Sequence, residues 1–169
     1  MTAASGADRL RLGMIGGGPG AFIGGVHRAA ARLDDQFTLV AGAFSSHSAR
    51  NGEMAAILHL DPARCYDDFT LMARNEAARA DGVDAVAIVT PNDLHCAIAT
   101  AFLEAGIHVL CEKPMALNLT EAEQMTASAA ASGSILALAH IYSGYPMVRH
   151  ARDLVGDRVV APHRPVVRV

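Results

Sequence analysis

The chain has 169 residues, a formal net charge of −3 and a hydrophobic content of 51%, which describes an ordinary globular protein with room for one substantial core. No apolar run approaches the roughly 18–20 residues that span a bilayer, and segment 1–9 lacks the apolar stretch of a secretory signal. We therefore expect a cytoplasmic protein with no membrane partner. The scattered cysteines and histidines and the lack of a basic cluster argue against a disulfide framework, a metal site and a nucleic-acid partner.

Short apolar runs alternate with helical patterns along most of the chain. The predicted strands are 10–15, 37–44, 64–66, 83–89, 107–111 and 135–139, and the predicted helices are 24–33, 49–60, 69–79, 94–105 and 120–132. Thr120 and Glu123 have the spacing of a capping box at the start of the last of these helices, and Gly133 ends it. This alternation predicts an α/β fold with a doubly wound parallel sheet, the Rossmann type of dinucleotide-binding domain.

A glycine-rich loop follows the first predicted strand and reads GGGPG at 16–20. Glycines in this place permit a tight turn and the close approach of a pyrophosphate, which the N–H groups at the start of the next helix then bind. The residues expected to contact a dinucleotide here are Gly16, Gly18, Gly20, Ala21, Phe22 and Ile23. A glycine-rich turn without a ligand is the alternative. A methyltransferase loop is disfavoured because Ile15 stands where such loops usually carry an acid.

The end of the second predicted strand bears on the choice of cofactor. NAD enzymes usually place an acid there, which binds the ribose and repels a 2′-phosphate, but this chain has none between Gln36 and Gly52. It has Ser45, Ser46 and Arg50 instead, and we expect these residues to contact NAD(P), with NADP favoured over NAD. The serines would also serve as helix N-caps, so the pattern permits NADP without requiring it.

Polar residues follow the later predicted strands as well. They are Thr90, Pro91, Asn92 and His95 after 83–89, Glu112, Lys113 and Pro114 after 107–111, and His140 after 135–139. Ligands bind outside the carboxyl ends of the strands in such sheets, so these positions are candidates for a site. By contrast, Asp67 and Asp68 are interpreted as a solvated turn. His27 is interpreted as a structural residue on the first helix, with a position facing the cofactor near the glycine loop as the alternative.

Lys113 is the only lysine, against thirteen arginines. Arginine does not give up its proton, whereas a lysine amine can, and it is also a compact donor. This exception therefore points to a position that arginine cannot serve. A surface lysine without a role is the alternative.

Four runs together resemble the Gfo/Idh/MocA family of NAD(P)-dependent oxidoreductases, which act on sugars, cyclitols and related polyols. They are GMIGGG at 13–18, TPNDLH at 90–95, AGIHVLCEKP at 105–114 and AHIYSGYP at 139–146, and the resemblance covers roughly 10–155. The resemblance implies that Lys113 and His140 are catalytic, Lys113 beside the nicotinamide and the substrate hydroxyl and His140 at the inner edge of the pocket. It also implies that Glu112 and Pro114 shape the part of the site around Lys113, while Thr90, Asn92 and His95 contact the cofactor.

The chain departs from that family in its length. Members have a second α/β domain that supplies most substrate contacts, a further acid/base histidine and the usual interface of a homo-oligomer. Here we expect a disordered tail at 1–9, one nucleotide-binding domain at 10–155 and an atypical tail at 156–169, where Pro162 and Pro165 argue against an uninterrupted strand. A truncated or interrupted gene, with the tail read in a shifted frame, would explain this, and a natural one-domain protein is the alternative.

Two classes of function follow from these observations. The first is the nucleotide-binding half of an oxidoreductase that transfers a hydride between a nicotinamide and a sugar- or polyol-like hydroxyl, with little or no turnover by these 169 residues alone. The second is a stand-alone NAD(P)-binding module or sensor without catalysis. Lys113 favours the first class, because a sensor has no need of an amine beside the nicotinamide.

Overall fold

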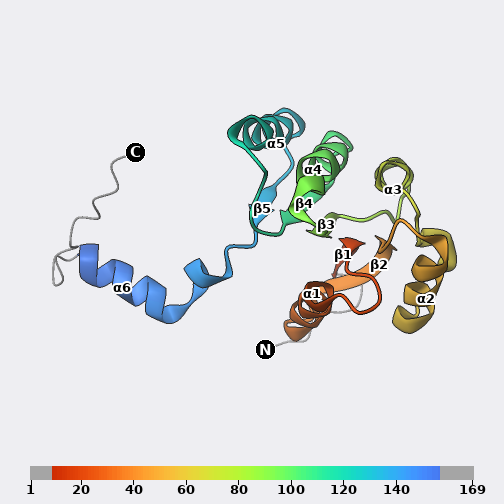
Figure 1. The fold of residues 1–169 in the computed structure, drawn as a ribbon, viewed down its shortest axis with the longest axis horizontal. Helices are drawn as coiled ribbons and strands as arrows, with labels where there is room; N and C mark the ends of the chain where they lie inside the picture. The colour runs from red at the N-terminus through yellow and green to blue at the C-terminus, as the bar shows by residue number, and fades with distance from the viewer. Residues whose placement is uncertain (1–8, 157–169) are drawn as a thin grey trace. The chain divides into compact units, whose positions relative to one another are not determined.

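The computed structural model describes residues 9–156 and contains a parallel five-stranded sheet with the strand order β2-β1-β3-β4-β5 (Figure 1). The strands are β1 (Leu10–Gly16), β2 (Phe37–Ala43), β3 (Ala85–Val89), β4 (His108–Cys111) and β5 (Leu136–Leu138). The helices are α1 (Phe22–Leu33), α2 (Ser48–Leu58), α3 (Phe69–Ala77), α4 (His95–Glu104), α5 (Leu119–Ser132) and α6 (Pro146–Gly156). The prediction of a doubly wound, Rossmann-type α/β fold is confirmed.

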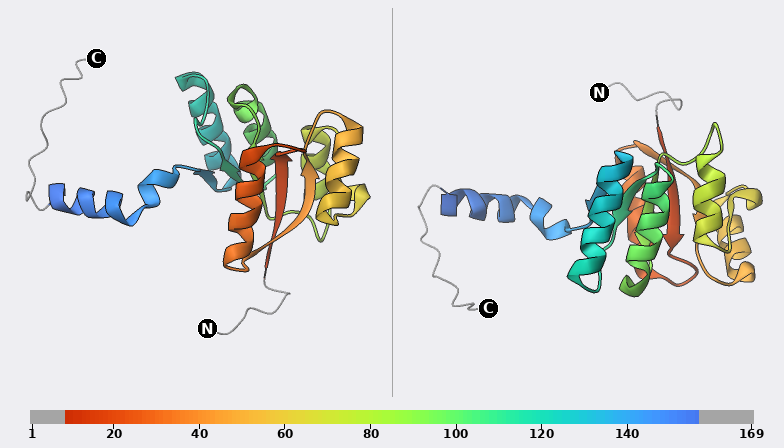
Figure 2. Two further views of the ribbon diagram at one scale, coloured as in Figure 1. Left: turned by 60° about the horizontal axis from the view of Figure 1, so that its bottom comes forward. Right: turned by 90° about the horizontal axis from the view of Figure 1, so that it is seen from above.

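Helices cover both faces of this sheet, α1 and α2 on one side and α3, α4 and α5 on the other (Figure 2). The alternation of side chains along the central strands explains the two layers. Val86 and Ile88 of β3 pack under α3 and α4, whereas Ala87 and Val89 face α1 and α2. Both faces of β3 are thus buried, as expected for a strand that is apolar without interruption.

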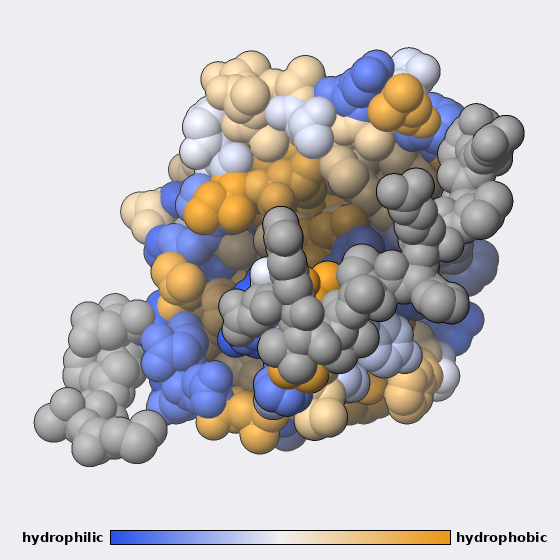
Figure 3. All heavy atoms as spheres, turned by 90° about the vertical axis from the view of Figure 1, so that its left-hand side faces the viewer, coloured by the Kyte–Doolittle hydropathy of each residue, from blue (hydrophilic) through white to orange (hydrophobic). Residues whose placement is uncertain are grey.

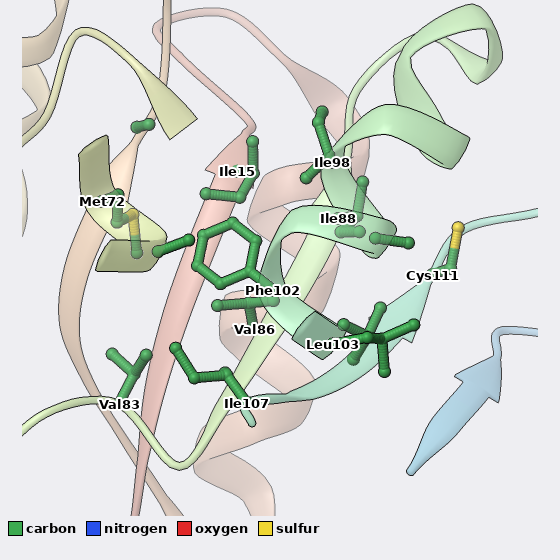
Figure 4. Close-up of a cluster of buried hydrophobic side chains, with 14 of the residues drawn as sticks. Ile15, Met72, Val83, Val86, Ile88, Ile98, Phe102, Leu103, Ile107 and Cys111 are labelled. Carbon is green, nitrogen blue, oxygen red and sulfur yellow. The ribbon is translucent and has the colours of Figure 1, made fainter. Parts of the chain in front are cut away.

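The larger core lies between the sheet and the α3–α4–α5 layer. Phe102 of α4 is fully buried at its centre, next to Ile15 of β1 and Val86 of β3 (Figure 4). Burying an aromatic side chain of this size removes a large apolar area from water. This core holds the carboxyl ends of β1 and β3 in fixed positions, and the candidate site lies at those ends.

Two local predictions are wrong. Residues 64–66 do not form a strand: Asp61 caps a 3-10 turn over Pro62–Arg64, and only a single bridge joins Cys65 to Gly42. Pro62 cannot donate to a sheet and favours the start of a helical turn, which explains the difference.

The capping box of α5 also lies two residues earlier than predicted. Asn118, not Thr120, is the N-cap, and its side chain accepts a hydrogen bond from the N–H of Glu121 at 3.0 Å. Glu121 in turn accepts from the N–H of Leu117 at 3.0 Å, the residue before the N-cap, whereas in a standard capping box it would accept from the N–H of the N-cap itself. The sequence contains two overlapping candidates, and the extended backbone of Asn118 decides between them.

The chain divides into two units between Ala139 and His140, which we call unit 1 (up to Ala139) and unit 2 (from His140 on). The segment 140–155, which the sequence analysis includes in the first domain, therefore belongs to unit 2. Unit 2 contains a 3-10 turn at Ile141–Gly144 and α6, which begins at Pro146. The rings of Tyr142 and Tyr145 pack edge to face with centroids 5.5 Å apart, as expected for helix-entry residues. Most of the predicted tails, 1–8 and 157–169, lies outside the described residues.

The surface carries single apolar side chains such as Phe22, Leu33 and Leu119 among polar ones. Figure 3 shows hydrophobic and hydrophilic residues side by side on one face of the molecule. Within residues 9–156, no helix has the length and apolar character needed to cross a membrane.

Candidate functional site

A cleft of about 670 Å³ opens at the carboxyl ends of β1, β2 and β3. The strand order reverses at β1, which pairs with β2 on one side and with β3 on the other. Loops on the two sides of such a point diverge and leave a crevice, which is where doubly wound sheets bind ligands. The predicted site residues that line the cleft are Gly16, Gly18, Ala21, Ser45, Ser46, Arg50, Thr90 and Pro91.

The glycine loop has a backbone that other residues would not adopt without strain. Gly16, Gly17 and Gly20 have φ values of +84°, +73° and +80°, in the left-handed region. At Gly18 the obstacle is steric, because a Cβ atom would lie 2.8 Å from the carbonyl oxygen of Phe44. Gly18 therefore allows the loop to lie against the end of β2, which narrows the cleft.

Helix α1 is in close contact with this loop. A Cβ on Gly24 would lie 2.5 Å from the Cα of Gly17, so only glycine lets the helix approach this closely. Two arginines hold loop carbonyls: Arg28 donates to the oxygen of Gly17 at 3.1 Å, and Arg50 donates to that of Pro19 at 2.9 Å. The N-cap of α1 is Ala21, which has no side-chain acceptor for the N–H groups of the first turn. Those donors can serve an anion.

The end of β2 is organised by Asn51, a buried residue of α2. Its side-chain oxygen accepts the N–H groups of Phe44 and Ser45, each at 2.9 Å. Its amide nitrogen donates to the carbonyl of Ser45 at 2.7 Å, that of Tyr66 at 3.0 Å and the carboxylate of Asp67 at 2.7 Å. One buried amide thus fixes the segment that follows β2 at the edge of the cleft.

Asp67 and Asp68 line the same cleft, although the sequence analysis treats them as a solvated turn. Hydrogen bonds from Ser48 and Asn51 hold the pKa of Asp67 below its ordinary value. Asp68 caps α3 by accepting from the N–H of Leu71 at 2.7 Å. The loop at 67–68 therefore places two carboxylates on a cleft that Arg50 also lines. The sequence alone does not show this, because it does not reveal that the segments before α2 and α3 border one cleft.

At the end of β3, Thr90 and His95 play different parts. The hydroxyl of Thr90, which lines the cleft, is buried and has no hydrogen-bond partner among the described residues. His95 is 1% exposed and lies behind the cleft. Its Nδ1 is 2.9 Å from the carbonyl of Pro114, and its Nε2 is 3.0 Å from that of Thr90. His95 thereby ties the strand-end loop of β3 to that of β4.

The end of β4 combines a buried carboxylate with an exposed amine. The side chain of Glu112 is 6% exposed, and that of Lys113 is 64% exposed, with the amine 4.0 Å from Glu112. His27 of α1 lies 2.8 Å from the other carboxylate oxygen. The peptide bond between Lys113 and Pro114 is cis. The role of His27 as the partner of Glu112 is not visible in the sequence, where it is only one histidine on a helix.

The remaining predicted site residues lie outside the cleft lining or outside unit 1. Those not lining the cleft are Gly20, Phe22, Ile23, Asn92, His95, Glu112, Lys113 and Pro114. Phe22 is 83% exposed at the start of α1. His140 belongs to unit 2, where it precedes the 3-10 turn and accepts from Ser143 through its backbone oxygen. Over residues 9–156, no group of three or more His, Cys, Asp or Glu side chains is arranged to hold a metal ion.

Comparisons with known proteins agree with this geometry. Residues 10–140 match the family GFO_IDH_MocA, described as an oxidoreductase family with an NAD-binding Rossmann fold. The chain is 37% identical over 158 residues to the oxidoreductase YfiI of Bacillus subtilis strain 168, covering 93% of this chain and 40% of that protein. It is 41% identical over 108 residues to the scyllo-inositol 2-dehydrogenase (NADP(+)) IolU of the same strain, covering 63% and 30%.

A solved structure is similar over nearly the same extent. The inositol dehydrogenase homolog of Azotobacter vinelandii, complexed with NADH and myo-inositol, matches with a TM-score of 0.87 and 41% identity, covering 92% of this chain and 41% of that one. The chain thus spans about 40% of the length of the first relatives that it matches. On this evidence of sequence and fold, the chain belongs to the Gfo/Idh/MocA family of oxidoreductases, and its residues 10–140 correspond to the NAD-binding Rossmann fold of that family.

Proposed function

We propose that unit 1 binds a nicotinamide dinucleotide in the cleft at β1, β2 and β3, as the nucleotide-binding half of an oxidoreductase. The observation that carries this proposal is the glycine loop, in which Gly18 accepts no Cβ and the first turn of α1 has no side-chain cap. A pyrophosphate would supply the missing acceptors for those N–H groups.

NADP is the cofactor that we propose in preference to NAD. Ser45, Ser46 and Arg50 line the ribose end of the cleft, and no acid follows β2 directly. Asp67 and Asp68 act against this preference, because their charge lies on the same cleft. The similarity to an enzyme named as NADP-dependent supports NADP, while the relative of solved structure binds NADH. The preference for NADP therefore requires that Arg50 bind the 2′-phosphate in addition to donating a hydrogen bond to the carbonyl of Pro19.

For the chemistry, we propose transfer of a hydride between the nicotinamide and a carbon that bears a hydroxyl group in a sugar or polyol. The bound dinucleotide supplies the hydride acceptor or donor. Lys113, at the end of β4, would hydrogen-bond the substrate hydroxyl, and its positive charge would stabilise the negative charge that develops on that oxygen. As the hydride leaves the carbon for the oxidised nicotinamide, the hydroxyl proton would pass to an acid/base histidine of a second domain, and in the reverse direction it would return to the carbonyl oxygen. The relatives named for inositol support this class of substrate.

A non-catalytic dinucleotide-binding module is the second candidate. The exposure of 64% at Lys113 favours it for this chain, because a reactive amine is usually enclosed together with its substrate. The two candidates make different predictions about turnover. Incubation with NADP or NAD and a panel of cyclitols and aldoses, followed by the absorbance of reduced nicotinamide, tests for oxidation. Turnover that disappears in Lys113→Gln supports the oxidoreductase, whereas dinucleotide binding with no turnover supports the module.

A further inference from the structure

His27 and Glu112 connect two parts of unit 1 that are 85 residues apart in the chain. His27 lies in α1, which begins directly after the glycine loop, and Glu112 lies between β4 and Lys113. The Nε2 atom of His27 is 2.8 Å from Oε1 of Glu112, and the two side chains are only 12% and 6% exposed. A buried pair of this kind requires good geometry, because removing one partner leaves the other without compensation.

The second oxygen of the same carboxylate holds the backbone of the lysine. Oε2 of Glu112 accepts a hydrogen bond from the N–H of Lys113 at 3.0 Å. Burial by itself raises the pKa of Glu112, but hydrogen bonds from His27 and from the N–H of Lys113 outweigh it and leave the pKa below its ordinary value. Both carboxylate oxygens of Glu112 therefore have a hydrogen-bond partner, Oε1 the ring of His27 and Oε2 the N–H of Lys113.

Adjacent residues of α1 thus reach the two ends of the proposed site. Arg28 donates to the carbonyl of Gly17 in the glycine loop at 3.1 Å, while His27 contacts Glu112 beside Lys113. A hydrophobic residue at 27 would fill the same space but would leave a buried carboxylate oxygen without a donor, which is costly. A histidine at position 27 is therefore explained by its hydrogen bond to the Glu112 carboxylate and not by packing alone.

We propose that His27 is a positioning residue for Lys113: by binding Glu112 it fixes the carboxylate that holds the Lys113 backbone N–H, and so sets where the lysine side chain leaves β4. The assignment of that side chain to the nicotinamide end rests on the proposed function. The contacts from His27 through Glu112 to the Lys113 N–H do not depend on the proposed function, because they lie within unit 1.

The test uses the fact that Lys113 is the only lysine, so isotope-labelled lysine gives one backbone amide signal in an NMR spectrum. The variants are His27→Leu, which removes the donor, and His27→Gln, which keeps an N–H donor at a similar reach. His59→Leu is the matched control, because His59 is exposed and follows α2. We expect the exchange of the Lys113 amide hydrogen with solvent to accelerate roughly tenfold in His27→Leu, the effect of one weakened hydrogen bond, with wild-type behaviour in His27→Gln and His59→Leu.

Glu112→Gln provides a second route if His27→Leu does not fold. Its uncharged oxygen is a weaker acceptor, so the Lys113 amide should again exchange faster. Unchanged exchange in either variant, or equal acceleration in His59→Leu, would overturn the proposal. Titration of NADH against the same samples keeps the two ideas apart. If the wild type binds no dinucleotide but the Lys113 amide responds to His27, the positioning role stands and the proposed function fails.

Discussion

The two ends of the candidate site differ in how completely unit 1 builds them. At the nucleotide end, the glycine loop, the segment fixed by Asn51 and Thr90 line a cleft. At the lysine end, the backbone of Lys113 is held by a buried carboxylate, but its side chain is 64% exposed. The comparison indicates that unit 1 by itself builds the cleft at the nucleotide end, whereas it leaves the side chain of Lys113 exposed. Substitutions at each end should therefore have unequal effects.

The largest effect is expected from Gly18→Val at the nucleotide end. The new Cβ would lie 2.8 Å from the carbonyl oxygen of Phe44, so the loop must shift. The N–H groups that we propose to bind the pyrophosphate would then change position. Loss of about two charge-assisted hydrogen bonds to a pyrophosphate should lower NADPH affinity by roughly 100-fold. Calorimetric titration measures this change, with circular dichroism to confirm the fold.

Gly52→Ala is the control for that substitution. Gly52 lies in α2, and a Cβ there meets no atom within 4 Å. Replacing a helical glycine by alanine should stabilise the protein by about 0.5–1 kcal/mol and leave affinity unchanged. Equal affinities of the Gly18 variant and this control would remove the glycine loop from the site.

Asn51→Ala should have the next largest effect, on stability. The substitution removes the acceptor for the N–H groups of Phe44 and Ser45 and leaves them buried without a partner. We expect the free energy of unfolding to fall by about 2–4 kcal/mol, as measured by urea denaturation. Asn75→Ala, at an exposed position of α3, is the control and should change it by less than about 0.5 kcal/mol. A loss below 1 kcal/mol at Asn51, within the range of one ordinary hydrogen bond, would mean that it does not organise the segment that follows β2.

Ser45→Asp sharpens the comparison within the nucleotide end. An acid at this position should repel the 2′-phosphate of NADP and accept the ribose hydroxyls of NAD. We expect the ratio of NADP to NAD affinity to fall roughly tenfold, as one added like charge near a phosphate implies. Ser134→Asp, in the loop between α5 and β5 and outside the cleft lining, is the charge-matched control. An unchanged ratio would show that Ser45 does not face the ribose and would direct attention to Ser46 and Arg50.

The smallest effect is expected from Lys113→Arg. Because the side chain is largely exposed, the free energy of unfolding should change by less than about 0.5 kcal/mol. Dinucleotide affinity should stay within about threefold of the wild type, since an exposed group contributes little binding energy. Urea denaturation and calorimetry measure the two quantities. A loss of several kcal/mol would identify a structural lysine and contradict its assignment to the reactive end.

The same comparison explains how much of the site the sequence could predict. The glycine loop could be predicted because most of its requirement for glycine is local, as the positive φ values at Gly16, Gly17 and Gly20 show, whereas the close approach of Gly18 to Phe44 becomes visible only in the fold. The position of Lys113 after β4 followed from the apolar run before it. The partners of these residues could not be predicted, because they depend on which helix lies next to which strand end. His27 reaches Glu112 across 85 residues, and no periodicity encodes that distance.

Predictions of local structure failed where two short signals competed. Asn118 and Thr120 both begin capping sequences, and only the backbone conformation of Asn118 selects the first. Likewise, the run at 64–66 has strand-like side chains, but Pro62 and the Asp61 cap favour a turn. The fold itself was predictable because the alternation of apolar strands with helical patterns extends over most of the chain and does not depend on any one signal.

Calorimetric titration of the unmodified chain with NADPH, NADP, NADH and NAD tests the central claim most directly, because it asks whether unit 1 contains a working dinucleotide site. The account predicts saturable binding with a dissociation constant on the order of tens to hundreds of micromolar, weak because the lysine end is open. It also predicts that NADPH and NADP bind more tightly than NADH and NAD. Absence of binding by all four dinucleotides at millimolar concentration, in a folded sample, would contradict it.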